Sequence, residues 1–385
     1  MARIIFAVII MFSFYAGTNY YIARKIYQWL SSFITQINIK VYAGIYILFI
    51  VSMLFAFLPI SSGVKRVISY VSSHWMGIYI YLLLFFFTVD MLVLFGCLVK
   101  IIPTPIPQSI RFYAGLIVIL LSICMIVYGK YNVSHINSVS YEIQMKRKTL
   151  QSEIKIVLVS DLHLGAVNSE KNLSKTVGKI NNSEPDIVCI AGDIFNDNIY
   201  ALYNPSKTLD LLKSITAKYG VYACLGNHDG GKTFKEMTGF LEQGNIKLLN
   251  DEYVTIDDRL VLVGRVDSSP IGGFDGLERK SFTDIKVPIN TDLPVVVMDH
   301  NPSNIGQYDN EVDLILSGHT HRGQIFPGNL ITKAIYVIDY GRYQKDNNSP
   351  NVIVTSGAGT WGMPMRIGTN NEIVIISLRG NSHAQ

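Results

Sequence analysis

The stretch IKIVLVSDLH, residues Ile154–His163, places a run that is apolar except for Lys155 just before an aspartate and a histidine two positions apart. Continuous runs of Ile and Val are typical of strands buried on both faces at the centre of a layered α/β domain. In an extended backbone, residues i and i+2 project to the same side. The stretch therefore predicts a central strand that directs Asp161 and His163 toward one point at its carboxyl end.

Further apolar runs follow, separated by polar segments with helical patterns. They are Asp186–Ala191, Val221–Leu225, Leu260–Val263, Pro294–Met298, Val312–Ser317, Val352–Thr355 and Glu372–Leu378. Strands that alternate with helices predict a layered α/β domain, which we assign to residues 153–385.

Four of these later runs also end in polar side chains. The endings are Gly192-Asp193, Gly226-Asn227-His228-Asp229, Asp299-His300 and Gly318-His319-Thr320-His321. Layered α/β folds build their sites at the carboxyl ends of strands, and glycine before a ligand lets the backbone approach closely. A single histidine after a strand is usually an ordinary polar residue, but five ordered blocks are a specific signal. Imidazole, carboxylate and amide donors predict two divalent ions, from among Mn, Fe, Zn, Co or Ni.

The ordered motifs D-x-H, G-D, G-N-H-D, a lone H and G-H-x-H resemble those of the calcineurin-like metallophosphoesterases, over roughly residues 151–380. The resemblance implies a β-sandwich flanked by helices. It assigns one ion to Asp161, His163, Asp193 and His321, and the other to Asp193, Asn227, His300 and His319. Asp193 would bridge the ions, His228 would face the substrate and assist the leaving group, and Asp229 would orient His228.

The stretches SDLHLG and HTHRGQIFP are most similar to a bacterial branch of this family, whose members often carry amino-terminal membrane segments. The protein phosphatases of the superfamily use G-D-x-H-G and G-N-H-E, and this chain departs from both. A phosphoprotein substrate is therefore not expected. The resemblance implies metal-dependent hydrolysis of a phosphodiester, phosphomonoester or pyrophosphate bond.

The first 141 residues differ in composition, because they contain nine basic residues and a single acidic one, Asp90. Four apolar stretches lie here, at about Ile4–Ile22, Val41–Ile60, Met76–Ile102 and Phe112–Tyr128. Each approaches the roughly 20 residues that span a bilayer, and the first lacks a signal-peptide cleavage site. We predict a four-span transmembrane domain over 1–130 and a polar juxtamembrane linker over 131–152, with a basic cluster at 146–148. Asp90, inside the third span, makes interhelical hydrogen bonds or serves substrate access.

Basic residues near the span ends favour cytoplasmic termini, and hence a catalytic domain on the cytoplasmic face of a bacterial membrane. A bilayer-anchored site favours a lipid-linked substrate. Soluble nucleotides, generic phosphodiesters and a non-catalytic sensor or scaffold role are the alternatives. No nucleic acid is expected as a partner, and the oligomeric state is left open.

Three arginines, Arg265, Arg322 and Arg366, are candidates for binding phosphate oxygens, although most arginines are surface or structural residues; Arg322, adjacent to the metal motif, is the strongest candidate. The segment Gly357–Met365, GAGTWGMPM, offers either an apolar surface for lipid or ordinary core packing.

Overall fold

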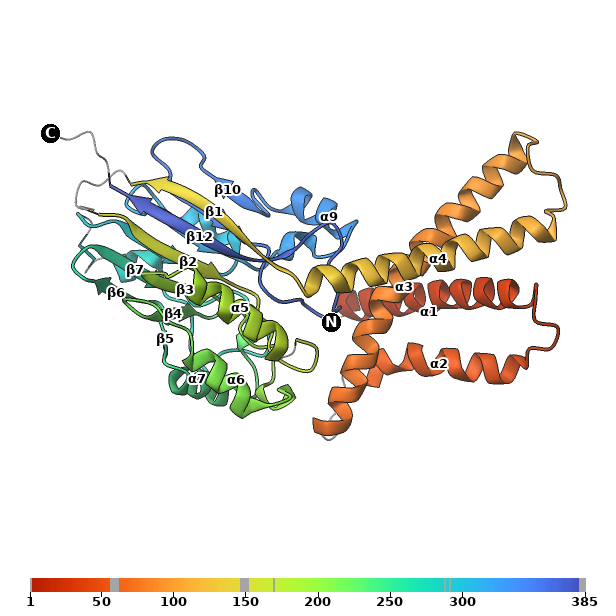
Figure 1. Cartoon of the computed structure of the whole chain (residues 1–385), viewed down its shortest axis with the longest axis horizontal. Coiled ribbons are helices and arrows are strands. Elements are labelled where there is room, and N and C mark those ends of the chain that lie inside the picture. The colour runs from red at the N-terminus through yellow and green to blue at the C-terminus, as the bar shows by residue number, and fades with distance from the viewer. Residues whose placement is uncertain are drawn as a thin grey trace. The chain divides into compact units, whose positions relative to one another are not determined.

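The computed structural model describes residues 2–55, 62–145, 152–168, 170–286, 289–290 and 292–380. The chain divides into two compact units, Met1–Gly129 and Lys130–Gln385 (Figure 1). The first unit is helical, and the second contains all of the described strands.

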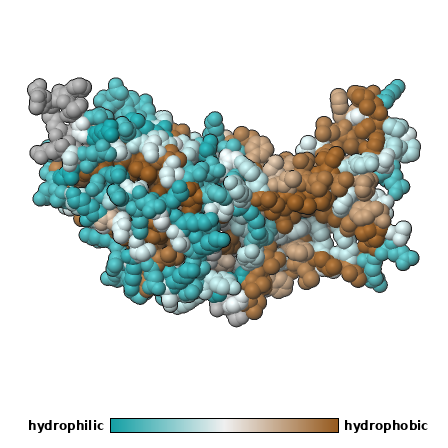
Figure 2. Space-filling model, viewed as in Figure 1, coloured by the Kyte–Doolittle hydropathy of each residue, from teal (hydrophilic) through white to brown (hydrophobic). Residues whose placement is uncertain are grey.

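The helical unit contains long apolar helices. These are α1 (Ala2–Leu30), α2 (Ile39–Phe55), α3 (Ser62–Leu98) and α4 (Gln108–Val133), the last of which continues into the second unit. Figure 2 shows their apolar side chains as extensive brown surface. Three are long and apolar enough to cross a membrane, namely α1, α3 and α4. The fourth, α2, has 17 residues, and the remainder of its predicted span lies outside the described residues.

Asp90 lies on α3 and is paired with α1. It accepts hydrogen bonds from the Tyr21 hydroxyl at 2.7 Å and from Lys25 Nζ at 2.6 Å. A carboxylate among apolar helices is costly unless it is paired, and here a cation and a hydroxyl satisfy both of its oxygens. This confirms the interpretation of Asp90 as an interhelical hydrogen-bonding residue.

The second unit is built on two six-stranded sheets. The first has the order β1 (Ile136–Gln144), β12 (Asn371–Arg379), β2 (Ile154–Val159), β3 (Ile187–Ala191), β4 (Val221–Cys224), β5 (Ile246–Leu248). The second has the order β10 (Gly341–Tyr343), β11 (Asn351–Val354), β9 (Leu314–Ser317), β8 (Val295–Met298), β7 (Leu260–Gly264), β6 (Glu252–Ile256). Every strand predicted from an apolar run is present, and β2, β3 and β4 pair in parallel.

The two sheets pack face to face, and helices cover their outer faces. In β2, Ile156 and Leu158 pack between the sheets, whereas Val157 and Val159 pack under the helices. This alternation explains why the run is apolar at every position except the half-buried Lys155. Against the first sheet lie α5 (Glu170–Asn182), α6 (Pro205–Lys213) and α7 (Phe234–Gln243) (Figure 1). The short α8 (Phe282–Lys286) packs on the second sheet, and α9 (Gly328–Ile335) follows the last metal-ligand motif. The predicted β-sandwich flanked by helices is confirmed.

The predicted linker over 131–152 is corrected by the structure. Strand β1 lies inside it and pairs in parallel with β12 from Ile136↔Asn371 to Gln144↔Arg379. Its sequence, INSVSYEIQ, reads as polar because β1 is an edge strand, and its buried residues are confined to its ends. The basic cluster at 146–148 lies outside the described residues. Only Ser134 and His135 separate α4 from β1.

Candidate active site

The carboxyl ends of β2, β3, β4, β8 and β9 meet at one edge of the sandwich and bring all seven predicted ligands together. Two groups have donor atoms close enough to hold a cation: Asp161, His163 and His321, and Asp193, His300 and His319. Asn227, the seventh, places its Oδ1 2.9 Å from His319 Nδ1. Residues separated by as many as 160 positions therefore form one site.

The first group surrounds a point between two imidazoles. His163 Nε2 lies 3.0 Å from His321 Nε2 and 3.5 Å from Asp193 Oδ2. His321 Nε2 lies 3.4 Å from Asp161 Oδ1. Ligands at 2.0–2.2 Å from a common ion lie roughly 3–3.5 Å from one another. These separations fit a single divalent cation.

The second group has the same spacing. His300 Nε2 lies 3.2 Å from Asp193 Oδ2 and 3.2 Å from His319 Nδ1. Asp193 Oδ2 is thus within reach of both groups, which is the position of a bridging carboxylate. A pair of sites that share one carboxylate is typical of centres with two metal ions.

The protonation of the first group also fits a metal. Burial lowers the pKa of His163 to about 3. Burial, together with the neighbouring His163 and the charge of Arg366, holds the pKa of His321 well below its ordinary value. Burial therefore favours the neutral form of both imidazoles, which is the form that donates a lone pair to a cation. The donor set of imidazole nitrogens and carboxylate and amide oxygens suits borderline divalent ions.

Neighbouring segments approach so closely before the ligands that only glycine fits there, as predicted. Gly192 has φ +78°, and a Cβ there would lie 2.7 Å from both Gly226 Cα and His300 Nδ1. A Cβ on Gly318 would overlap the Ser160 hydroxyl. The ligands themselves adopt unusual backbone angles, with φ +55° at Asp161 and +52° at Asp193. Such strain is common at functional sites and persists because the surrounding fold holds it.

His228 lies in the same site but is positioned by a residue that the sequence did not reveal. Its Nδ1 lies 2.8 Å from Asp197 Oδ1, and the Asp197 amide donates to the His228 carbonyl at 3.0 Å. Burial disfavours protonation of His228, but the Asp197 hydrogen bond and the charge of Asp193 outweigh it and raise its pKa. The motif gives no signal for Asp197, because it lies four residues beyond Asp193 in a loop.

The predicted role of Asp229 in orienting His228 is therefore wrong. Asp229 is buried, and its Oδ1 accepts from the amides of Ile194 and Phe195 at 2.8 and 2.9 Å. Its Oδ2 accepts from the Gly226 amide at 2.9 Å. Asp229 thus ties the loop after β3 to the loop after β4 and supports the ligands on both.

Two of the three arginines predicted to bind phosphate are instead hydrogen-bonded within the protein. Arg265 is fully buried, and its Nε donates to Asp251 at 2.6 Å. Arg366 is also fully buried, and its Nη2 donates to the carbonyl oxygens of Ser356 and Gly359 at 2.5 and 2.7 Å. Neither is available to a substrate, because each guanidinium is fully buried and hydrogen-bonded to protein oxygens.

Arg366 nevertheless supports the site, since its Nη1 donates to the His321 carbonyl at 3.2 Å. Arg322 is partly exposed, and its guanidinium lies 4.2 Å from the ring centroid of Tyr340. It is absent from the described lining of the cavity that opens over the two groups of ligands. Its contact with substrate stays a prediction.

A cavity of about 440 Å³ opens over the two groups of ligands. Its polar floor includes His163, Asp193 and His228, whereas Ile271, Ile331, Trp361 and Met363 line its walls. Trp361 is 49% exposed, while Met365 is fully buried, so the segment Gly357–Met365 combines an open surface with core packing. Gln324 fixes this loop through hydrogen bonds to the Trp361 amide and carbonyl at 2.7 and 2.8 Å.

Comparison with known proteins agrees with this geometry. Residues 154–323 match the calcineurin-like phosphoesterase family. A metallophosphoesterase of Campylobacter jejuni is 32% identical over 70% of this chain and 71% of its own length. A metallophosphoesterase of Helicobacter pylori is 30% identical over 61% of this chain and 62% of its own. A transmembrane protein with metallophosphoesterase domain from Danio rerio is 26% identical over 81% of this chain and 74% of its own.

Among solved structures, the NAD nucleotidase of Haemophilus influenzae aligns with a TM-score of 0.37 and 16% identity, over 54% of this chain and 51% of its own. That similarity is too low to support a conclusion about this chain. The metallophosphoesterase relatives and the converged donor atoms agree with each other. The chain belongs to the calcineurin-like phosphoesterase family and is a metal-dependent phosphoester hydrolase.

Proposed function

We propose that the protein hydrolyses a phosphodiester, phosphomonoester or pyrophosphate bond of a lipid-linked substrate. The observation that carries this proposal is the cavity of about 440 Å³, in which the ligand groups lie beside apolar walls. Ile331 and Trp361 on those walls are 59% and 49% exposed. An apolar surface beside a phosphoryl-binding site suits a substrate that carries both a phosphate and a hydrocarbon portion.

The chain around the end of α4 supports a substrate in a membrane. Asn132, in the last turn of this candidate span, donates to the Arg366 carbonyl at 3.1 Å, and Asn371 donates to the Val133 carbonyl at 2.9 Å. Arg366 in turn donates to the His321 carbonyl. The end of the helix is thus two hydrogen bonds away from a metal ligand. We propose a bacterial cytoplasmic membrane, with the unit Lys130–Gln385 on its cytoplasmic face, because basic residues near the span ends favour cytoplasmic termini.

The chemistry follows from the donor set and from His228. Two divalent ions, from among Mn, Fe, Zn, Co or Ni, supply when bound the positive charge that activates a water and neutralises phosphoryl oxygens. Asp161, His163, Asp193, Asn227, His300, His319 and His321 would hold them. The His228 imidazole lines the cavity, and Asp197 favours its protonated form. His228 donates that proton to the departing oxygen, which lowers the barrier to bond cleavage.

The test uses the full chain in lipid nanodiscs, loaded with each candidate ion in turn. We expect turnover of lipid phosphates with kcat/KM at least tenfold above that of soluble phosphodiesters and nucleotides. Equal or faster turnover of the soluble substrates would remove the lipid assignment while leaving the hydrolase assignment in place. An Asp193→Asn variant serves as the inactive control, since it loses the charge shared by both ligand groups.

A further inference from the structure

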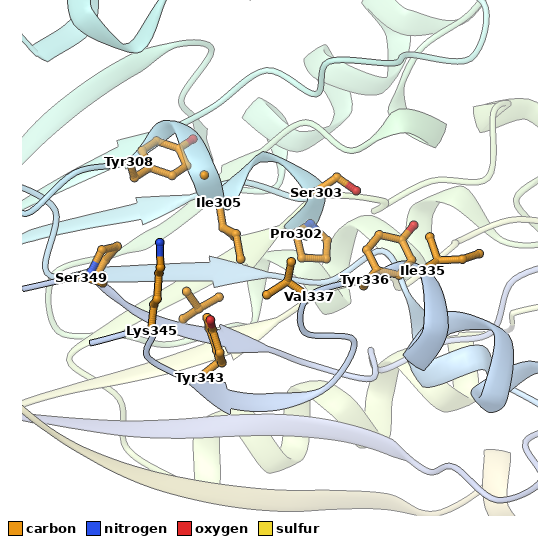
Figure 3. Close-up of a pocket in the computed structure, with 13 residues that line it drawn as sticks. Pro302, Ser303, Ile305, Tyr308, Ile335, Tyr336, Val337, Tyr343, Lys345 and Ser349 are labelled. Carbon is orange, nitrogen blue, oxygen red and sulfur yellow. The ribbon is translucent and has the colours of Figure 1, made fainter. Parts of the chain in front are cut away.

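A second cavity, of about 640 Å³, lies in the same unit on the outer side of the second sheet. Figure 3 shows Ile335 and Tyr336 at one end of it, beside α9, and Lys345 and Ser349 at the other. Ile305 and Val337 lie between these ends in the same view. The cavity is therefore elongated, and its size is within the range of about 300–1,000 Å³ that is typical of ligand-binding pockets.

One residue joins this cavity to the metal site. Tyr336 lines both cavities, and its ring centroid is 6.2 Å from that of the ligand His319. Ile335, which lines the second cavity, and Ile331, which lines the first, both belong to α9. A molecule with its phosphate over the ligand groups therefore needs only to pass Tyr336 to enter the second cavity.

The second cavity offers aliphatic surface that a hydrocarbon chain could contact. Of the thirteen described residues that line it, Lys345 alone carries a formal charge. Lys345 is exposed, so its methylene stem contributes to the wall while its ammonium group remains in water. Ile305, Ile335, Val337 and Val352 supply aliphatic surface, and the hydroxyl groups in the lining belong to Ser303, Tyr308, Tyr336, Tyr343 and Ser349.

Two aliphatic residues of this wall are largely exposed. Ile335 is 69% exposed and Val337 is 74% exposed. With Phe326, Leu330 and Ile331, they form a run of exposed large apolar residues within twelve positions. A concentration of this kind usually marks a surface that another apolar body covers.

We propose that the second cavity binds the hydrocarbon chain of the substrate while the phosphate is held at the ligand groups. This inference rests on the proposed function, because it assigns a place to the apolar part of a lipid-linked phosphate. Tyr336 forms the boundary between the two parts of the substrate. The cavity then determines chain-length preference, and the metal site determines the bond that is cleaved.

The test measures hydrolysis of p-nitrophenyl alkyl phosphodiesters of increasing chain length by the full chain in nanodiscs. We expect KM to fall with each added methylene, by up to about fourfold where the methylene is fully buried, with kcat little changed. Gly306→Trp fills the cavity from an exposed position where a Cβ meets nothing within 4 Å. Val337→Lys places a charge on its exposed wall. Both variants should flatten the dependence of KM on chain length and leave the shortest ester unaffected.

Two matched variants serve as controls. Asn310→Trp adds the same ring nearby at an exposed residue outside the lining, and Leu330→Lys adds the same charge to an exposed apolar residue of α9 that lines neither cavity. Both should retain the chain-length dependence. The proposal is overturned if Gly306→Trp and Val337→Lys retain it too, or if Leu330→Lys loses it equally, since membrane contact would then be responsible.

A second measurement does not depend on turnover. A non-hydrolysable alkyl phosphonate with a diazirine at the chain end should crosslink to peptides spanning 302–308 and 335–352 in the wild type and not in Gly306→Trp. Crosslinks confined to other peptides would refute the location. Absence of hydrolysis of every ester, at every chain length, would instead refute the proposed function, and this assignment would fall with it.

Discussion

Replacing Asp197 by Asn tests whether His228 acts as the proton donor and whether Asp197 is the residue that positions it. Asn keeps an oxygen acceptor for the His228 Nδ1 proton but removes the negative charge that lies 2.8 Å away. The pKa of His228 is raised in part by this charge, so the substitution lowers it. At neutral pH a smaller fraction of His228 is then protonated.

The expected loss of kcat/KM in Asp197→Asn depends on how strongly solvent screens the Asp197–His228 hydrogen bond. A hydrogen bond to a charged group contributes about 1.5–3 kcal/mol. The Asp197 side chain is 45% exposed, so solvent screening places this one at the lower end. Asn retains a neutral hydrogen bond of about 0.5–1.5 kcal/mol, so the loss is up to about 1 kcal/mol, which corresponds to at most roughly fivefold in kcat/KM. Loss of the proton donor itself, in His228→Gln, should cost about 10²–10⁴-fold.

The assay is a pH–rate profile for the wild type, Asp197→Asn, His228→Gln and the double variant. The alkaline limb reports loss of the proton from His228, so in Asp197→Asn it should move to lower pH. In the His228→Gln background, Asp197→Asn should have no further effect. Asp275→Asn removes another exposed carboxylate, paired with Lys235 at 2.8 Å, and should leave the profile unchanged. Additive losses in the double variant, or an unmoved alkaline limb, would refute the reasoning.

Three further outcomes follow from the site. Asp193→Ala should abolish turnover and reduce bound metal from two ions to one or none, because Asp193 Oδ2 lies within reach of both ligand groups. Elemental analysis measures the metal content, and full content would exclude a bridging role. Gly192→Ala should lower the free energy of unfolding by about 1–3 kcal/mol, because the backbone angle of φ +78° is strained for any residue with a Cβ and that Cβ would lie 2.7 Å from Gly226 Cα. An unchanged midpoint of denaturant unfolding would contradict this. Arg265→Met should lower the melting temperature, because it leaves the buried Asp251 carboxylate without its ion-pair partner, and KM should stay unchanged. A large rise in KM with no change in melting temperature would restore the predicted role of Arg265 in substrate binding.

The strands and the ligand motifs were readable from local sequence. A strand buried on both faces, such as Ile154–Val159, is apolar at every position except the half-buried Lys155, so it stands out against the polar segments on either side. Its carboxyl end is marked by the change to Asp161 and His163. Strand β1 was not readable in this way, because its burial is limited to its ends and its polar residues face water at the edge of a sheet. Its place depends on pairing with β12, more than 200 residues away.

The roles of the side chains that surround the ligands depend on the tertiary structure. Arg265 and Arg366 look like phosphate-binding residues in the sequence, but burial pairs them with Asp251 and with backbone oxygens. Asp197 has no motif, since its role requires only that its loop pass beside His228.

The amino-acid sequence by itself determined the kind of chemistry, because ligand type and order along the chain are local properties that survive without knowledge of the fold. Only the folded chain decided which carboxylate meets which imidazole and which cavity adjoins the metal site, since these depend on distances between segments far apart in sequence. The second cavity is the clearest case. Ile305, Tyr336 and Val352 come from three separate segments and share a wall only after the second sheet has formed.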